Sequence, residues 1–271
     1  MFVIGGVQKT TLVDFPRKVA AIVFTQGCNF RCGYCHNPDL LEIKQICPPE
    51  LYKGNRRGTS SVTRYAQVQS AQIVSESFTK EKFLSFLQTR INKLDGVVIT
   101  GGEPTLQSGL YDFIKEIKQM NFDVKLDTNG TNPQIIEHLI KDNLLDYIAM
   151  DIKAPLEKYP QIVNIVSRSE GEGVRERVNF VLNNIQKSIK IIMQSNVDYE
   201  FRTTVLKSQL SYEDFDQIGQ MIKGAKRYYL QKFVSSEIFD KNLLNEQTYT
   251  NEEFKTICQN LKKYVAFADY R

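Results

Sequence analysis

Residues 19–37 read VAAIVFTQGCNFRCGYCHN, and this stretch decides the fold. Its first seven residues are apolar or β-branched and too few for a buried helix, so they predict a strand over 19–25. Three cysteines, Cys28, Cys32 and Cys35, follow that strand at the spacing C-x3-C-x2-C. The pattern therefore predicts a metal-binding loop at the carboxyl end of a buried strand.

Outward from this loop, the chain alternates between two kinds of segment. Short apolar, β-branched runs predict strands at 96–100, 123–127, 147–150, 201–205 and 227–233. Apolar residues at helical spacing predict helices at 79–94, 110–120, 132–143, 174–189 and 211–224. Strands separated by helices need crossover connections, which make the sheet parallel with helices on its outer side. Six such units predict an α/β fold, a partial (β/α)6 barrel with parallel strands.

One segment interrupts this rhythm. Residues 45–75 carry two prolines and a basic group formed by Lys53, Arg56 and Arg57. Long loops inside compact domains are uncommon and tend to be lids, partner contacts or disordered segments. We expect a single domain over 1–271 with an inserted loop at about 45–75, which is either solvated or a contact for a partner.

The composition is that of an ordinary globular protein, with 42% hydrophobic and 24% charged residues. The 35 basic and 31 acidic residues leave a net charge of +4, without the interleaved aromatic and basic residues of a nucleic-acid module. No apolar run near the start approaches the ~20 residues of a membrane helix, and residues 1–11 lack the apolar segment of a signal peptide. We expect a cytoplasmic protein that contacts neither membrane nor nucleic acid.

Three of the five cysteines are clustered, whereas Cys47 and Cys258 stand alone. An odd number with three in eight residues is typical of a metal site and not of a disulfide framework. A cubane iron–sulfur cluster normally takes four thiolates, so three thiols from one loop would leave one iron open. The alternative is a tetrahedral zinc site completed by His36, although zinc motifs favour paired C-x2-C sequences.

Polar residues also follow three later predicted strands. They are the segment Gly101-Gly102-Glu103, the pair Asp127-Thr128, and Asp151 with Lys153. Active-site residues of parallel barrels lie at the carboxyl ends of the strands, so these segments should meet the cysteine loop. Each has a plain alternative when taken alone, because Gly-Gly-Glu fits a turn and Asp151 with Lys153 fits an ion pair.

The cysteine loop, with an aromatic residue before its last cysteine, resembles that of the radical S-adenosylmethionine (SAM) superfamily. The resemblance implies that Cys28, Cys32 and Cys35 hold a 4Fe-4S cluster. It also implies that the amino and carboxylate groups of SAM complete the fourth iron, and that the fold is a partial (β/α)6 barrel.

The resemblance further implies which residues bind SAM. The segment Gly101-Gly102-Glu103 matches the superfamily motif for the methionine amino group. Tyr34, His36 and Asn37 fit the adenine pocket, where Tyr34 and His36 would contact the base through main chain and ring.

The later strand ends resemble those of glycyl-radical activating enzymes. In that family, residues matching Asp127-Thr128 and Asp151 surround the cofactor carboxylate with a monovalent cation among them. The same resemblance implies that Lys153 reaches the cofactor. Arg202 on the fifth predicted strand and Gln231 near the end of the sixth are further candidates for cofactor binding, with ordinary barrel polar residues as the alternative.

Residues 5–16, GGVQKTTLVDFP, and residues 24–28 resemble activating proteins of the anaerobic ribonucleoside-triphosphate reductase. Arg17 departs from that pattern, which usually has glycine there. The resemblance implies that an electron from a donor such as flavodoxin or ferredoxin cleaves SAM at the cluster. The resulting 5′-deoxyadenosyl radical would take a hydrogen from a glycine Cα of a partner reductase, and no side chain need act as a general acid or base.

Two other functions stay open at this point. One is a radical enzyme acting on a small molecule, such as 7-carboxy-7-deazaguanine synthase, which would need a closed pocket with substrate ligands near the sixth predicted strand. The other is a non-catalytic zinc or iron–sulfur module, which would fold and bind metal without cleaving SAM.

Overall fold

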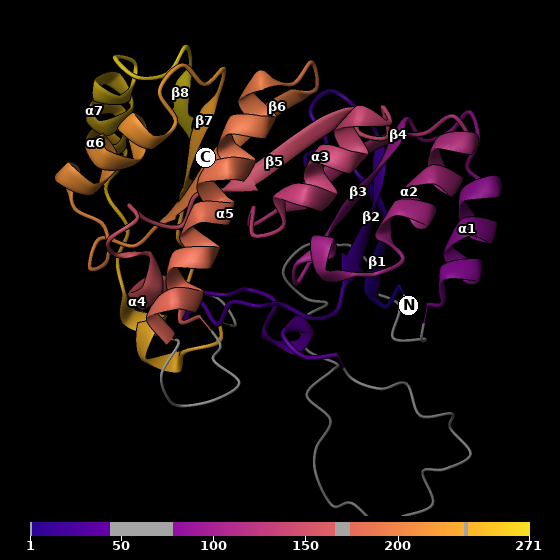
Figure 1. The fold of residues 1–271 in the computed structure, drawn as a ribbon, viewed down its shortest axis with the longest axis horizontal. Coiled ribbons are helices and arrows are strands. Elements are labelled where there is room, and N and C mark those ends of the chain that lie inside the picture. Colours follow the sequence, from indigo (N-terminus) through magenta and orange to yellow (C-terminus); the bar gives the residue numbers. More distant parts are fainter. Residues whose placement is uncertain (1, 44–77, 166–173, 236–237) are drawn as a thin grey trace, which may run out of the picture.

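A computed structural model describes residues 2–43, 78–165, 174–235 and 238–271 (Figure 1). These residues form one sheet of eight strands in chain order. The strands are β1 Ile4–Thr11, β2 Ala20–Thr25, β3 Gly96–Gly101, β4 Asp123–Thr128, β5 Tyr147–Asp151, β6 Asp198–Val205, β7 Tyr228–Lys232 and β8 Ala268–Tyr270. Every neighbouring pair is parallel except β1 with β2, which is antiparallel.

The predicted α/β fold with a mostly parallel sheet is confirmed, and β2 to β7 are the six strands expected from the sequence. The two outermost strands, β1 and β8, were not predicted from the sequence. β1 contains Gly5 and Gly6, and its buried and exposed residues do not alternate regularly. Its pairing with β2 also has two register shifts. β8 is only three residues long, which is too short for a periodic pattern to be visible.

Figure 1 shows the helices lying on the outer side of the sheet, where the crossovers place them. They are α1 Lys80–Gln88, α2 Leu110–Gln119, α3 Pro133–Lys141, α4 Tyr159–Val163, α5 Val174–Gln194, α6 Tyr212–Met221 and α7 Asn251–Leu261. Short 3₁₀ turns occur at Pro38–Leu40, Pro104–Leu106 and Lys241–Asn245. In the part of the chain that the structure describes, no helix combines the length and apolar character needed to cross a membrane.

The starts of two helices carry residues that favour a helix start, whereas the predicted helix ends differ from the structure, as at α5, which continues to Gln194. Asn132 precedes α3 with Pro133 at its first position, and the Ser211 amide donates to Asp214 at 2.7 Å at the start of α6. The helix predicted over 79–94 was too long: α1 ends at Gln88, and Ile91 is 44% exposed. The apolar spacing continues through a turn after the helix, so periodicity alone overran the end.

The inner face of the sheet is apolar near the beginnings of the strands. Phe15, 2% exposed, packs there against Ala20, Ile22, Val98, Tyr147 and Ala149. Arg17, two residues later, has a φ of 62°, in the left-handed region that glycine adopts without strain, which accounts for the glycine usual at this position. Because these apolar side chains fill the interior near the beginnings of the strands, the space available to a ligand lies at the carboxyl ends of the strands.

The insertion predicted at about 45–75, with Lys53, Arg56, Arg57 and Cys47, lies outside the described residues.

Candidate functional site

A cavity lies where the carboxyl ends of β2 to β6 meet the cysteine loop. All of the predicted site residues except Gln231 line it, namely Cys28, Cys32, Tyr34, Cys35, His36, Asn37, Gly101, Gly102, Glu103, Asp127, Thr128, Asp151, Lys153 and Arg202. These residues come from five separate segments of the chain. The parallel topology brings them together because every one of these strands ends on the same side.

Main-chain hydrogen bonds hold the cysteine loop on both sides. The Cys28 amide donates to the Leu41 carbonyl at 3.1 Å, and the Phe239 amide donates to the Cys35 carbonyl at 3.1 Å. Within the loop, the Arg31 guanidinium donates to the carbonyls of Cys28 at 2.8 Å and Phe30 at 2.9 Å. The loop is therefore fixed by protein contacts as well as by any metal it binds.

The three thiols of this loop face the cavity in an environment that favours their protonated form. Burial raises the pKa of Cys28 to about 12 and that of Cys32 to about 11, and it also raises the pKa of Cys35. Thiols of this kind ionise at neutral pH when a metal displaces the proton. Buried thiols sharing one cavity are a donor set that fits an iron–sulfur cluster.

A single zinc ion bound by the same thiols is the alternative to a cluster. Among the described residues, no three His, Cys, Asp or Glu side chains lie close enough together to hold one metal ion. A tetrahedral zinc site needs four donors around one point, whereas a cluster offers a separate iron to each thiolate. The arrangement thus favours the cluster over the zinc alternative that includes His36.

The two glycines at the end of β3 allow a close contact between the main chain of this loop and that of the cysteine loop. Gly101 has a φ of 118°, and a Cβ placed on Gly102 would lie 2.2 Å from the Gly27 carbonyl oxygen. Both positions therefore need glycine. This contact packs the β3 loop directly against the start of the cysteine loop.

Glu103 is a structural centre of the site. It is 1% exposed, and its carboxylate accepts hydrogen bonds from the Thr105 amide and hydroxyl, the Thr128 hydroxyl and the Asn129 amide at 2.6 to 3.1 Å. Burial raises its pKa, although these donors counteract the rise. The side chain joins the loops after β3 and β4.

We expect Glu103→Gln to lower the free energy of unfolding by about 2–3 kcal/mol. The NH₂ group of glutamine would face an N–H or O–H donor at a position where a carboxylate oxygen now accepts a hydrogen bond. Urea unfolding of the purified protein measures this. Glu116→Gln is the matched control: Glu116 is 39% exposed and pairs with Lys80, so its loss should cost less than about 1 kcal/mol. Equal effects of the two substitutions would contradict the role given to Glu103.

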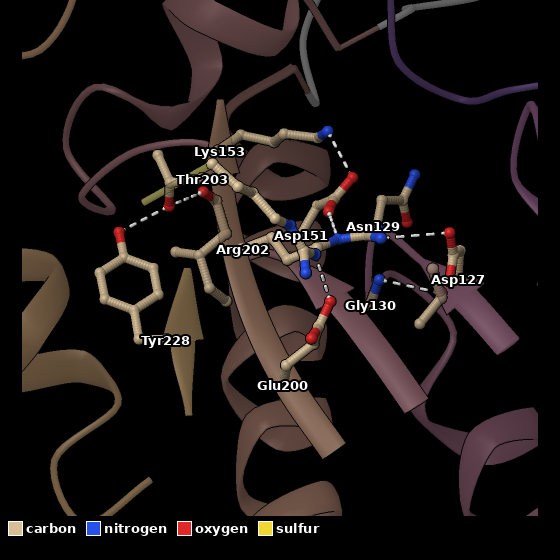
Figure 2. A network of polar contacts seen from close by, with 12 residues as sticks. Asp127, Asn129, Gly130, Asp151, Lys153, Glu200, Arg202, Thr203 and Tyr228 are labelled. Atoms are coloured by element: carbon tan, nitrogen blue, oxygen red, sulfur yellow. Dashed lines mark hydrogen bonds and ion pairs between the residues drawn. The ribbon is translucent and has the colours of Figure 1, made fainter. Parts of the chain in front are cut away.

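Five alternating charges form a chain at the cavity floor, and four of them, all except Lys125, line the cavity. Arg202 Nη1 contacts Asp127 Oδ2 at 3.2 Å, and its Nε contacts Asp151 Oδ1 at 2.8 Å. Lys153 Nζ lies 2.8 Å from Asp151 Oδ2, and Lys125 Nζ pairs with Asp127 Oδ1. Figure 2 shows Arg202, Asp151 and Lys153 within this network.

These pairs favour the charged forms of Asp127, Asp151, Lys153 and Arg202. Burial alone would raise the pKa values of Asp127 and Asp151, but Arg202 with Lys125 or Lys153 outweighs it and holds both below the usual range. Burial alone would lower the pKa values of Lys153 and Arg202, and the two carboxylates raise both instead.

Tyr34 and His36 lie against the network. The Tyr34 hydroxyl is buried and has no hydrogen-bond partner among the described residues, and Lys153 Nζ lies 5.9 Å from its ring centroid. A buried hydroxyl facing a cavity without a protein partner suits a polar ligand. The His36 ring stacks on Phe233 at 6.2 Å, and burial and then Lys153 lower its pKa.

Other predicted residues fall outside the cavity. The cavity ends at β6: Thr204 lines it, but Gln231, the β7 residue paired with Thr204, does not. His138 lies exposed, contacts Asp142 at 3.4 Å and stacks on Tyr111. Cys258, which stands apart from the clustered cysteines in the sequence, is buried on α7.

Several residues that line the cavity were not predicted from the sequence. Thr100 and Thr204 lie on strands beside predicted site residues, and Asn129 follows Thr128, so strand alternation and position at a strand end could have indicated them. Phe30 and Leu41 carry no chemical signal that separates them from core residues. Lys125 is not a lining residue and was not predicted either, although it is two residues from Asp127 and therefore on the same face of β4.

Comparisons with known proteins agree with this geometry. A sequence profile of the radical SAM superfamily matches residues 22–222. A candidate glycyl-radical enzyme activating enzyme of Methanocaldococcus jannaschii is 31% identical over 264 residues, which cover 97% of this chain and 92% of that protein. The pyruvate formate-lyase-activating enzyme of Clostridium pasteurianum is 29% identical over 154 residues, which cover 55% of this chain and 52% of that enzyme.

Among solved structures, QueE from Escherichia coli matches 100% of this chain with 93% of its own. The TM-score is 0.53 and the sequence identity is 13%, so this likeness concerns the fold alone.

Proposed function

The chain belongs to the radical SAM superfamily, and on that premise we propose that it activates a glycyl-radical enzyme. The observation that carries the proposal is the cavity in which the three thiols of one loop face polar residues from four other strand ends. The relative from M. jannaschii, similar over nearly the full length of both chains, supports the choice of protein partner over small-molecule substrate.

Membership of the superfamily implies a 4Fe-4S cluster and SAM. When bound, the two together supply a one-electron reductive cleavage of SAM, and the net products are methionine, 5′-deoxyadenosine and a glycyl radical on the partner. The electron comes from an external donor of the flavodoxin or ferredoxin class.

In this proposal the chain binds and orients the reactants. Cys28, Cys32 and Cys35 would hold the cluster, and the main chain at Gly101 and Gly102 would offer polar groups to the cofactor amino group. The charged floor then faces the carboxylate.

The remaining proposed contacts with SAM lie at the sides of the cavity. Tyr34, His36 and Asn37 would border the adenine. Glu103 and Thr128 would act by holding their loops in place. The apolar interior below the site excludes water from one side of the reaction.

For the partner, we propose the anaerobic ribonucleoside-triphosphate reductase, because residues 5–16 resemble those of its activating proteins. A cytoplasmic location suits a protein whose cysteines are clustered for metal binding. A glycine is a suitable target because it has no Cβ to obstruct a close approach to the cavity.

Mixing the anaerobically reduced holoprotein, SAM and the reductase is expected to give a glycyl radical signal on the reductase, detected by electron paramagnetic resonance. A Cys35→Ser protein treated in the same way is the control and should give none. SAM cleavage at full rate on a small molecule, with no radical on any protein, would refute this function and favour the small-molecule enzyme.

A further inference from the structure

The strand-end carboxylates have no free oxygen. Asp127 Oδ1 pairs with Lys125 and Oδ2 with Arg202, whereas Asp151 Oδ1 pairs with Arg202 and Oδ2 with Lys153. All four oxygens therefore accept a hydrogen bond from a positively charged group. The monovalent cation implied by the family resemblance does not fit this arrangement, because it would have to displace one of these groups.

Lys125 is the unusual member of the network. It is 2% exposed, in the middle of β4, and its ammonium group contacts the carboxylate two residues farther along the same strand. A lysine is buried so completely only where a partner compensates its charge. An ammonium group also carries the same single charge as a potassium or sodium ion, on a stem anchored by the strand.

We propose that the ammonium group of Lys125 takes the place of a monovalent cation, so that SAM binds here without one. The network has three positive and two negative side chains, so one positive charge is left over for the carboxylate of the cofactor. The inference rests on the proposed SAM site.

Electrostatics supports this assignment. A metal ion among these groups would lie close to Lys125, Lys153 and Arg202, and like charges at such distances repel strongly where water is largely excluded. The side chains of all three are at most 14% exposed. The built-in cations are covalently attached, so they are present at any salt composition.

The test measures the dissociation constant of SAM for the reconstituted protein by equilibrium dialysis in potassium, sodium or choline chloride at equal ionic strength. The wild-type protein should bind SAM equally well, within about twofold, in all three salts. For Lys125→Met, affinity in choline should fall by about tenfold or more, and potassium should restore it, because Asp127 then has an oxygen free for a metal ion. A second readout is the melting temperature of the metal-free protein, which potassium should raise for Lys125→Met alone.

Lys118→Met is the matched control. It removes a lysine that pairs with Asp146 away from the cavity, and its SAM binding should not depend on the cation. A wild-type affinity that falls tenfold when choline replaces potassium would overturn the inference, whether or not the Lys125 variant folds. Equal affinities of Lys125→Met in potassium and choline would overturn it as well. Failure of the wild type to bind SAM in any salt would refute the proposed function itself, so the two failures are distinguishable.

Discussion

Replacing Cys32 with alanine is expected to abolish the cluster. Anaerobic reconstitution should load roughly four irons per wild-type chain and fewer than about one per Cys32→Ala chain. Cys32 is 7% exposed and shares its cavity with the other two thiols of the loop, so its loss leaves a buried gap that no other cysteine among the described residues can fill. Iron analysis and the visible absorption of the cluster measure the effect.

Cys258→Ala is the control for this experiment. Cys258 is buried at 5% exposure on α7 and is absent from the cavity, so the variant should keep its full iron content. The sequence also predicts that Cys47→Ala keeps the cluster. An equal loss of iron from the Cys47 or Cys258 variant would contradict the assignment of the cluster to the three clustered thiols.

Arg202→Gln is expected to cause the largest loss of stability among single substitutions in the charged floor. Among the residues that the structure describes, Arg202 is the one group paired with both Asp127 and Asp151, and its side chain is 11% exposed. Its removal leaves two buried carboxylates with one cation each, and breaking a buried pair in this way costs about 3–5 kcal/mol. Guanidinium unfolding at pH 7 checks this value.

Arg227→Gln provides the comparison. Arg227 pairs with Asp198 at 2.8 Å, but both side chains are about one third exposed, at 32% and 37%. Exposed pairs contribute about 1 kcal/mol or less. Similar losses for the two arginine variants would show that burial of the Arg202 pairs does not govern their contribution.

The difference between wild type and Arg202→Gln should also depend on pH. Both Asp127 and Asp151 have folded-state pKa values below the ordinary value of 3.8. Their charge pairs therefore contribute fully above that pH, and the contribution is lost as pH falls through the lowered folded-state values. The difference in unfolding free energy should hold from pH 7 to about 5 and shrink below pH 4.

Local pattern was sufficient to predict most of the fold. The strands β2, β3 and β5 are nearly continuous apolar runs because both of their faces are buried, and such runs are visible in a sequence. The end of α1 could not be predicted in the same way. Apolar residues after Gln88 keep the helical spacing, but the chain forms a turn there, in which Asn92 adopts a φ of 64°.

For the site, the sequence by itself determined which residues follow which strand, and therefore that Cys28, Cys32 and Cys35 would meet Gly101-Gly102 and the strand ends at 127 and 151. This follows because parallel strands joined by helices must all end on one side.

Only the tertiary structure decided which groups are paired. Arg202 lies 75 residues from Asp127 and 51 from Asp151, yet it contacts both. Lys125 appeared in the sequence as one lysine of many, and its burial made it a candidate for a built-in cation. Glu103 matched a cofactor motif, but its oxygens are taken by protein donors. Sequence patterns record backbone direction and burial, whereas the partner of a buried charge depends on strands that meet only after the sheet has formed.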